Sequence, residues 1–122
     1  MNEPHQVAEA FLRAWTSGDM PAARALCADD MHFVGPIEEW HDPDDHLRGL
    51  APVADVLDRL DVHLIVAAGD DVVIVYDLVT TTPVGTARIA EWSTVRDGKI
   101  SAIRAHFDSH PWRSAGFGGE GA

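Results

Sequence analysis

The chain has 122 residues and a formal net charge of −11, because 20 Asp and Glu outweigh 9 Lys and Arg. This length fits one domain that buries one hydrophobic core or one ligand pocket. A hydrophobic fraction of 46% excludes a wholly disordered chain. Nucleic acids and anionic membranes are excluded as partners, since their binding needs clustered cations, and Lys99 is the only lysine beside scattered arginines.

Cysteine usage and the start of the chain indicate a cytoplasmic protein. Cys27 is the only cysteine, so no disulfide within the chain is expected and a reducing compartment is indicated. Residues 1–5 lack the positive and apolar regions of a signal peptide. Apolar runs such as 72–75 are far shorter than the ~20 residues of a membrane-spanning helix. We therefore expect a soluble cytoplasmic domain.

The first third of the chain predicts two helices and a strand. Apolar residues at helical spacing predict an amphipathic helix over 6–17. Asp19 is a suitable N-cap for a second, short helix that ends near Cys27. Residues 30–36 predict a strand that Gly-Pro ends. The short connection between the helices indicates that they pack together.

A polar loop and a third helix are expected next. The acidic segment 38–47 predicts a loop that carries Trp40 and His46. A helix is expected from near Leu50 to Leu60, with Pro52 in its first turn and Val53 and Leu57 on its apolar face.

The second half of the chain predicts a sheet. Segments rich in Val, Ile and Thr predict strands over 62–68, 72–80, 86–96 and 100–108. The turns between them are short, so neighbouring strands are expected to be antiparallel. Helices followed by such a meander predict an α+β fold with three N-terminal helices on one strongly curved sheet. One domain is expected over 1–113, followed by a flexible Gly-rich tail over 114–122.

Three segments resemble one known superfamily. They are FLRAWTSGDMPAARALCADDMHFVGP, LRGLAPVADVL and STVRDGKISAIRAHFD, and the resemblance that they carry covers about residues 5–110. Their order and spacing resemble the nuclear transport factor 2-like superfamily, in particular its SnoaL-like and ketosteroid-isomerase-like branches. The resemblance implies a cone-shaped α+β barrel with an apolar cavity inside, and homodimers through the outer sheet face.

The resemblance also shows which of the superfamily's catalytic groups this sequence lacks. The position of the ketosteroid-isomerase general base is Gly35, and that of the oxyanion tyrosine is Phe11. The aspartate of epoxide hydrolases and SnoaL-type cyclases falls at Ala105. One acidic position survives, because the second oxyanion donor of ketosteroid isomerases aligns with Glu91. These absences argue against those particular mechanisms.

Projecting the cavity of the superfamily onto this sequence predicts the site. Side chains alternate between the two faces of a strand, which places Glu91 and Tyr76 inside as candidate catalytic groups. The other expected ligand-binding residues are Phe11, Trp15, Met31, Phe33, Trp40, Val53, Leu57, Ile74, Ile89, Ser93, Ile103 and Phe107. A mostly apolar wall with few polar groups is typical of a small-molecule pocket.

Each candidate group has a second interpretation. Burial would raise the pKa of Glu91, which suits a general acid, but Glu91 alternatively pairs with Arg88 or Arg104, or faces solvent. Tyr76 donates to a ligand oxygen or to Glu91, or it fills the core with its hydroxyl on the backbone. Trp40 and His46 are interpreted as a gate over the cavity mouth, and Trp40 alternatively covers apolar surface.

Two clusters contain residue types that bind metals. The segment 41–46 holds two His and three Asp, whereas His106, Asp108 and His110 alternate on the expected last strand. The first is typical of a solvated acidic turn, since a metal needs three or four converging ligands. The second falls on the outer face, where an interfacial role is favoured. No metal and no organic cofactor are expected.

Three functions remain open. The first is a cofactor-independent isomerase, dehydratase or cyclase, in which Glu91 moves or donates a proton and Tyr76 stabilises charge on a substrate oxygen. The second is a non-catalytic carrier or sensor of a small hydrophobic molecule. The third is a dimerising interaction module of the same fold, since a fold alone does not give function.

Overall fold

Two packed helices come first in the computed structural model, which describes residues 3–116. Helix α1 (Pro4–Thr16) and helix α2 (Met20–Ala25) confirm the two expected helices. The Asp19 carboxylate caps α2 by accepting a hydrogen bond of 3.1 Å from the Ala22 backbone N–H. Gly18 has a φ of 87°, the left-handed conformation that the tight reversal between the helices requires.

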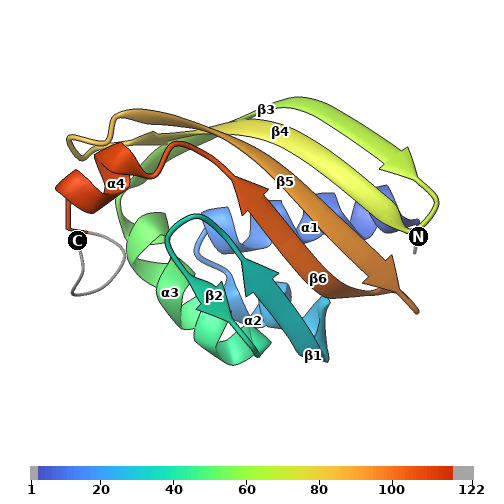
Figure 1. Ribbon diagram of the computed structural model, residues 1–122. Helices are drawn as coiled ribbons and strands as arrows, with labels where there is room; N and C mark the ends of the chain where they lie inside the picture. The colour runs from blue at the N-terminus through green and yellow to red at the C-terminus, as the bar shows by residue number, and fades with distance from the viewer. Residues whose placement is uncertain (1–2, 117–122) are drawn as a thin grey trace.

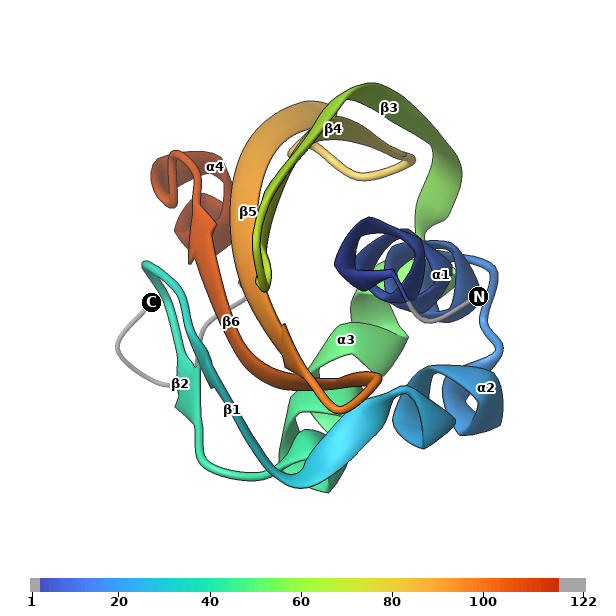
Figure 2. The same cartoon turned by 90° about the vertical axis from the view of Figure 1, so that its right-hand side faces the viewer.

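Six strands form one mixed sheet in the order β2-β1-β6-β5-β4-β3. The bounds are β1 (Cys27–Val34), β2 (Glu39–Trp40), β3 (Leu57–Ala68), β4 (Asp71–Thr80), β5 (Thr86–Arg96) and β6 (Lys99–His106). Strands β1 and β6 are parallel, and the other neighbours are antiparallel. The sheet curves around helix α1 without closing into a barrel (Figures 1 and 2). The expected α+β cone is therefore confirmed.

The third helix lies earlier in the chain than the sequence predicts. Helix α3 spans Pro43–Asp55, and β3 already begins at Leu57, so a helix over 50–60 is wrong. The Asp42 side chain caps α3 by accepting a hydrogen bond of 2.8 Å from the Asp45 backbone N–H. Pro43 therefore occupies the first turn. Pro52, which the sequence predicts in that turn, lies inside the helix near its C-terminal end.

The C-terminal part of the described chain also differs from expectation. Strand β6 ends at His106, and a short helix α4 (His110–Ser114) follows. The Asp108 carboxylate accepts from the His110 backbone N–H at 3.1 Å, which turns the chain out of the sheet. The strand therefore does not continue to residue 108. The predicted tail begins inside α4 at Ser114, and its part over 117–122 lies outside the described residues.

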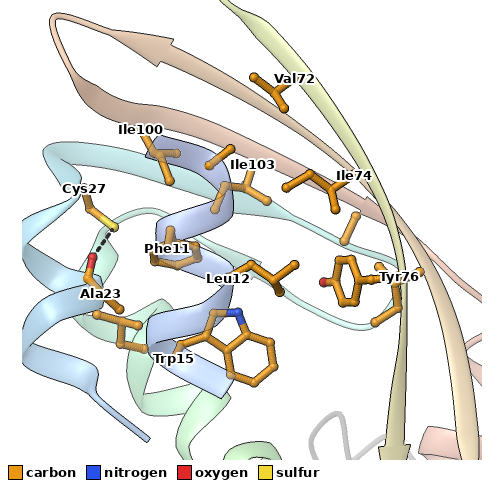
Figure 3. Close-up of a cluster of buried hydrophobic side chains, with 14 of the residues drawn as sticks. Phe11, Leu12, Trp15, Ala23, Cys27, Val72, Ile74, Tyr76, Ile100 and Ile103 are labelled. Atoms are coloured by element: carbon orange, nitrogen blue, oxygen red, sulfur yellow. Dashed lines mark hydrogen bonds between the residues drawn. The ribbon is translucent and has the colours of Figure 1, made fainter. Parts of the chain in front are cut away.

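The hydrophobic core lies on the concave side of the sheet. Phe11, Leu12 and Trp15 of α1 are almost fully buried against inward residues of β4 and β6. Figure 3 shows these three residues beside Ile74 and Tyr76, whose ring points from β4 toward α1. Burying a side chain of this size contributes roughly 1.5–3 kcal/mol. Helix α1 is therefore held by its apolar face inside the curve of the sheet.

Candidate functional site

The concave side of the sheet contains a cavity of about 110 Å³. One water needs about 10–15 Å³ by the same measure, so the cavity has room for a small molecule. Most lining residues are apolar or aromatic, as in ligand pockets generally. The cavity is lined by Trp15, Phe33, Gly35, Ile37, Glu38, Trp40, His46, Gly49, Leu50, Val53, Tyr76, Leu78, Ile89, Glu91, Ala105, Phe107 and Trp112.

The structure divides the residues predicted for the site into two groups. Those that line the cavity are Glu91, Tyr76, Trp15, Phe33, Trp40, Val53, Ile89, Phe107 and His46. Those that pack in or against the hydrophobic core, outside the cavity lining, are Phe11, Met31, Leu57, Ile74, Ser93 and Ile103. Strand alternation gives the face of a residue but not its depth along the cone, and the buried strand residues of the second group are Met31, Ile74, Ser93 and Ile103. Leu57 begins β3, so its expected place on the apolar face of a third helix is wrong.

Glu91 and Tyr76 form the polar centre of the cavity. The Tyr76 hydroxyl donates a hydrogen bond of 2.8 Å to Glu91 Oε1. They come from adjacent strands, where Ile74 pairs with Glu91 and Tyr76 pairs with Ile89. The two side chains therefore meet diagonally across the β4–β5 ladder. Both are almost fully buried, with 5% of Glu91 and 2% of Tyr76 exposed.

Burial makes Glu91 a proton donor and acceptor near neutral pH. Desolvation raises the pKa of its carboxyl from 4.5 to about 7, against a smaller lowering by the hydrogen bond from Tyr76. Burial, and then the charge of Glu91, raises the pKa of Tyr76 well above 10, so the phenol keeps its proton. Among residues 3–116, Glu91 Oε2 has no hydrogen-bond partner. One carboxylate oxygen is thus held by protein and the other is left without a protein partner.

The arginine partners considered for Glu91 are engaged elsewhere. Arg88 forms an ion pair of 2.8 Å with Asp77 on the outer face of the sheet. The guanidinium of Arg104 stacks on the ring of Trp92, with its carbon 3.7 Å from the ring centroid. Glu91 is therefore buried as an acid hydrogen-bonded to a phenol, without a cationic partner among the described residues.

His46 lies in the wall of the cavity instead of in a loop. It belongs to the first turns of α3 and is only 3% exposed, so the predicted loop over 38–47 is wrong from Pro43 onward. Its ring stacks on Phe33, with centroids 4.1 Å apart and an interplanar angle of 16°. Burial lowers the pKa of His46 from 6.5 to about 3. The imidazole is therefore neutral at physiological pH.

Trp40, on the two-residue strand β2, lines the cavity and is partly exposed. Its indole N–H donates to Glu38 Oε2 at 3.1 Å. Gly49 of α3 lies beneath the ring, and a Cβ at that position would meet Trp40 Cζ2 at 3.1 Å. Trp40 thus rests on the helix because residue 49 has no side chain. The interpretation of Trp40 as a gate stays a prediction.

The two clusters considered as metal sites do not converge. His41 is exposed whereas His46 is buried in α3, so the segment 41–46 is split between surface and core. His106 ends β6 and His110 begins α4, so the expected alternation along one strand is wrong. Within the described part of the chain, no group of three or more His, Cys, Asp or Glu side chains has an arrangement that could hold a metal ion.

Removing the Tyr76 hydroxyl is expected to raise the pKa of Glu91 above about 7. The hydrogen bond from Tyr76 stabilises the charged carboxylate, and Tyr76→Phe removes it while keeping the ring. The pKa is measured by following the ¹³C signal of the Glu91 side-chain carboxyl against pH, with Glu91→Gln to identify the signal. A midpoint that stays where it is in the wild type would contradict this coupling.

The fold and the cavity define a class of small α+β cone proteins with one pocket under a curved sheet. Residues 8–103 match the SnoaL-like domain family. The chain belongs to this family, and the resemblance to the nuclear transport factor 2-like superfamily is confirmed. No curated protein matches the chain. Among the described residues, no helix is long and apolar enough to span a membrane.

Solved structures share the fold over most of their length. A protein from Kribbella flavida DSM 17836 is 29% identical, with 90% of each chain covered and a TM-score of 0.83. An NTF2-like protein from Cytophaga hutchinsonii is 19% identical over 91% of this chain and 95% of its own, with a TM-score of 0.79. An LEH-like epoxide hydrolase from M. tuberculosis is 21% identical over 94% of this chain and 90% of its own, with a TM-score of 0.74.

Proposed function

We propose that this protein is a cofactor-independent enzyme of the isomerase kind, which moves a proton within a small, largely hydrophobic, oxygenated molecule. The observation that carries the proposal is a buried carboxyl, Glu91, with a pKa of about 7 in an apolar cavity. A group with such a pKa both takes and returns a proton at neutral pH. Isomerisation needs a group that first takes a proton and then returns it, and it needs no net oxidant or reductant.

The proposed step uses both oxygens of Glu91. The carboxylate takes a proton from a carbon next to the substrate carbonyl, and the electron pair of the broken C–H bond moves toward the carbonyl oxygen. Glu91 then returns the proton to a different carbon of the same molecule. Tyr76 holds Oε1 at 2.8 Å, which leaves Oε2 for the substrate. The phenol hydrogen is already used in this bond, so Tyr76 acts as a positioning residue in place of the direct oxyanion donor expected above.

The relatives support an enzyme of this fold without specifying the reaction. The M. tuberculosis protein of the same fold is an epoxide hydrolase, and at 21% identity it shows the fold alone. Gly35 and Ala105 line the cavity without any acidic group, so the general base of ketosteroid isomerases and the aspartate of epoxide hydrolases have no counterpart at these positions. A chemistry based on Glu91 alone is consistent with this lining.

A ligand carrier is the second candidate. The observation that favours it is the lining itself, in which small or apolar residues occupy positions that bear catalytic groups in related enzymes. A carrier needs shape and apolar contact, whereas an enzyme needs a polar group that exchanges protons with the ligand. The two proposals therefore differ in a measurable property, proton exchange on the bound molecule.

Hydrogen–deuterium exchange on carbon tests the proposal without a known substrate. Small ketones such as cyclohexanone, 2-cyclohexenone and acetophenone are incubated with the protein in D₂O, and loss of the signal next to the carbonyl is followed by ¹H NMR. The enzyme proposal predicts exchange faster than in buffer, with a rate that rises with pH to a midpoint near 7. Binding of these ketones without exchange would establish the carrier instead.

We further propose that a second copy of the chain covers the outer face of the sheet. This face exposes Leu64, Val66, Val73 and Trp92. Two of its arginines are paired with acids, since Arg59 lies 3.1 Å from Asp61 and Arg88 lies 2.8 Å from Asp77, and Arg104 stacks on Trp92. Two copies with a net charge of −11 repel each other. The electrostatic repulsion between them is smallest where an apolar face with paired charges is buried, so we place the contact between the copies on this face.

Charge placed on this face is expected to separate the dimer. Leu64→Glu adds a carboxylate at a half-exposed apolar position, and sedimentation is expected to show 13.3 kDa chains where the wild type sediments at twice that mass. Ala22→Glu, an exposed position on α2 away from the sheet, is the matched control and is expected to leave the mass unchanged. A monomeric wild type would refute the dimer.

A further inference from the structure

We infer that His46 binds the substrate oxygen in the cavity that contains Glu91, and that the site therefore takes small uncharged carbonyl compounds and rejects carboxylates. This inference rests on the proposed role of Glu91 and adds the group that selects the substrate. It comes from the structure, because the sequence pattern assigned His46 to a surface loop.

The position of His46 carries the inference. The residue is 3% exposed and lines the same cavity as Glu91 and Tyr76. Among residues 3–116, its buried Nδ1 has no hydrogen-bond partner. A buried polar atom without a partner costs roughly 1–3 kcal/mol, so its retention in a cavity wall is explained by a ligand that supplies the missing bond.

The surroundings of His46 fix the direction of its ring. Phe33 stacks on one side at a centroid distance of 4.1 Å, and Phe11 lies 6.3 Å away in a nearly parallel plane. The backbone at His46 is held in the first turns of α3, where Asp42 caps the helix. An imidazole held in this way contacts a ligand without losing side-chain freedom on binding.

The charge of the cavity selects an uncharged ligand. Burial keeps His46 neutral by lowering its pKa to about 3. The ionisable residues that share the lining are Glu38, Tyr76 and Glu91, and no Lys or Arg of the described chain lines the cavity. A carboxylate ligand would bring a further negative charge beside two acidic side chains with no cation to balance it, whereas a ketone brings no charge.

A neutral imidazole suits the proposed proton transfer. When Nδ1 carries the ring hydrogen, it donates a hydrogen bond to the carbonyl oxygen of the substrate. This hydrogen bond strengthens as negative charge develops on that oxygen. The proton itself passes from carbon to Glu91 and back to carbon, so His46 keeps its own hydrogen throughout. A neutral histidine acts as an electrophile in this manner in other proton-transfer enzymes.

Ligand binding tests the inference independently of turnover. The wild type is labelled with ¹⁵N-histidine, and cyclohexanone and cyclohexanecarboxylate are titrated at pH 8. We expect cyclohexanone to shift the His46 ring ¹⁵N signals and the carboxylate to bind at least tenfold more weakly. His46→Phe keeps the aromatic stack on Phe33 and is expected to weaken cyclohexanone binding about tenfold, whereas His46→Gln retains an N–H donor and is expected to bind more tightly than His46→Phe.

The outcomes separate this inference from the function on which it rests. If His46→Phe binds cyclohexanone as tightly as the wild type, or if the wild-type ¹⁵N signals do not move on binding, the role of His46 is refuted. Exchange that still requires Glu91 would then leave the proposed function standing. Conversely, His46-dependent binding without exchange would refute the isomerase and keep the substrate class.

Discussion

Glu91→Gln is expected to abolish the enzyme-dependent part of deuterium exchange next to the carbonyl, with a loss of about 10²–10⁴-fold. The amide has nearly the shape of the carboxyl and still accepts a hydrogen bond from Tyr76, but it neither takes nor returns a proton. The rate is measured by ¹H NMR on cyclohexanone at several pH values. Retention of the wild-type rate in Glu91→Gln would show that another group performs the chemistry.

Asp77→Asn is the matched control for this change. It makes the same carboxyl-to-amide replacement one residue beyond Tyr76, but on the outer face, where Asp77 accepts hydrogen bonds from Arg88 and His63. These bonds hold the pKa of Asp77 at about 2. We expect Asp77→Asn to exchange cyclohexanone protons at the wild-type rate, because residues of opposite parity on a strand face opposite sides.

The free energy of unfolding is expected to depend on pH in opposite directions at the two buried groups of the cavity. Folding raises the pKa of Glu91 from 4.5 to about 7, so the folded protein loses roughly 3 kcal/mol as the pH rises through this range. Folding lowers the pKa of His46 from 6.5 to about 3, so roughly 5 kcal/mol is lost as the pH falls through that range.

Between pH 4.5 and 6.5 the contributions of Glu91 and His46 to the free energy of unfolding change with pH in opposite directions. Variants at one of the two residues separate these contributions. Relative to the wild type, Glu91→Gln is expected to gain roughly 3 kcal/mol between pH 4.5 and 7.5, because the cost of ionising a buried carboxyl is gone. His46→Phe is expected to gain stability relative to the wild type as the pH falls below 6.5. Urea unfolding at four pH values measures both. Parallel curves for the three proteins would contradict the pKa shifts.

The strands and the polar pair were accessible to sequence reasoning for a physical reason. Side chains alternate between the two faces of a strand, so one residue known to point inward determines the direction of the others on that strand. The turns between the strands determine which residues pair across the sheet. This alternation predicts Glu91 and Tyr76 on one face, and the resemblance to the superfamily indicates that this face is the inner one. The hydrogen bond between them agrees with one of the two interpretations of Tyr76.

The sequence predicts His46 in a loop because two prolines compete for the start of one helix. Pro52 follows Leu50 and Ala51, which cannot cap a helix, whereas Pro43 follows Asp42, which can. A helix that is capped by Asp42 and begins at Pro43 includes His46. The depth of a residue such as Ile74 within the core depends on the curvature of the whole sheet, which local sequence does not encode.

The buried cysteine has a practical consequence for studying this protein. The Cys27 thiol donates to the carbonyl of Ala23 at 3.5 Å, and burial raises its pKa to about 12 (Figure 3). Alkylating reagents attack the thiolate, which is almost unpopulated at such a pKa. The natural chain is therefore expected not to react with maleimide dyes. Ile37 is a partly exposed residue of the cavity lining, so Ile37→Cys would give a single attachment point for a fluorophore whose emission reports whether the cavity is occupied.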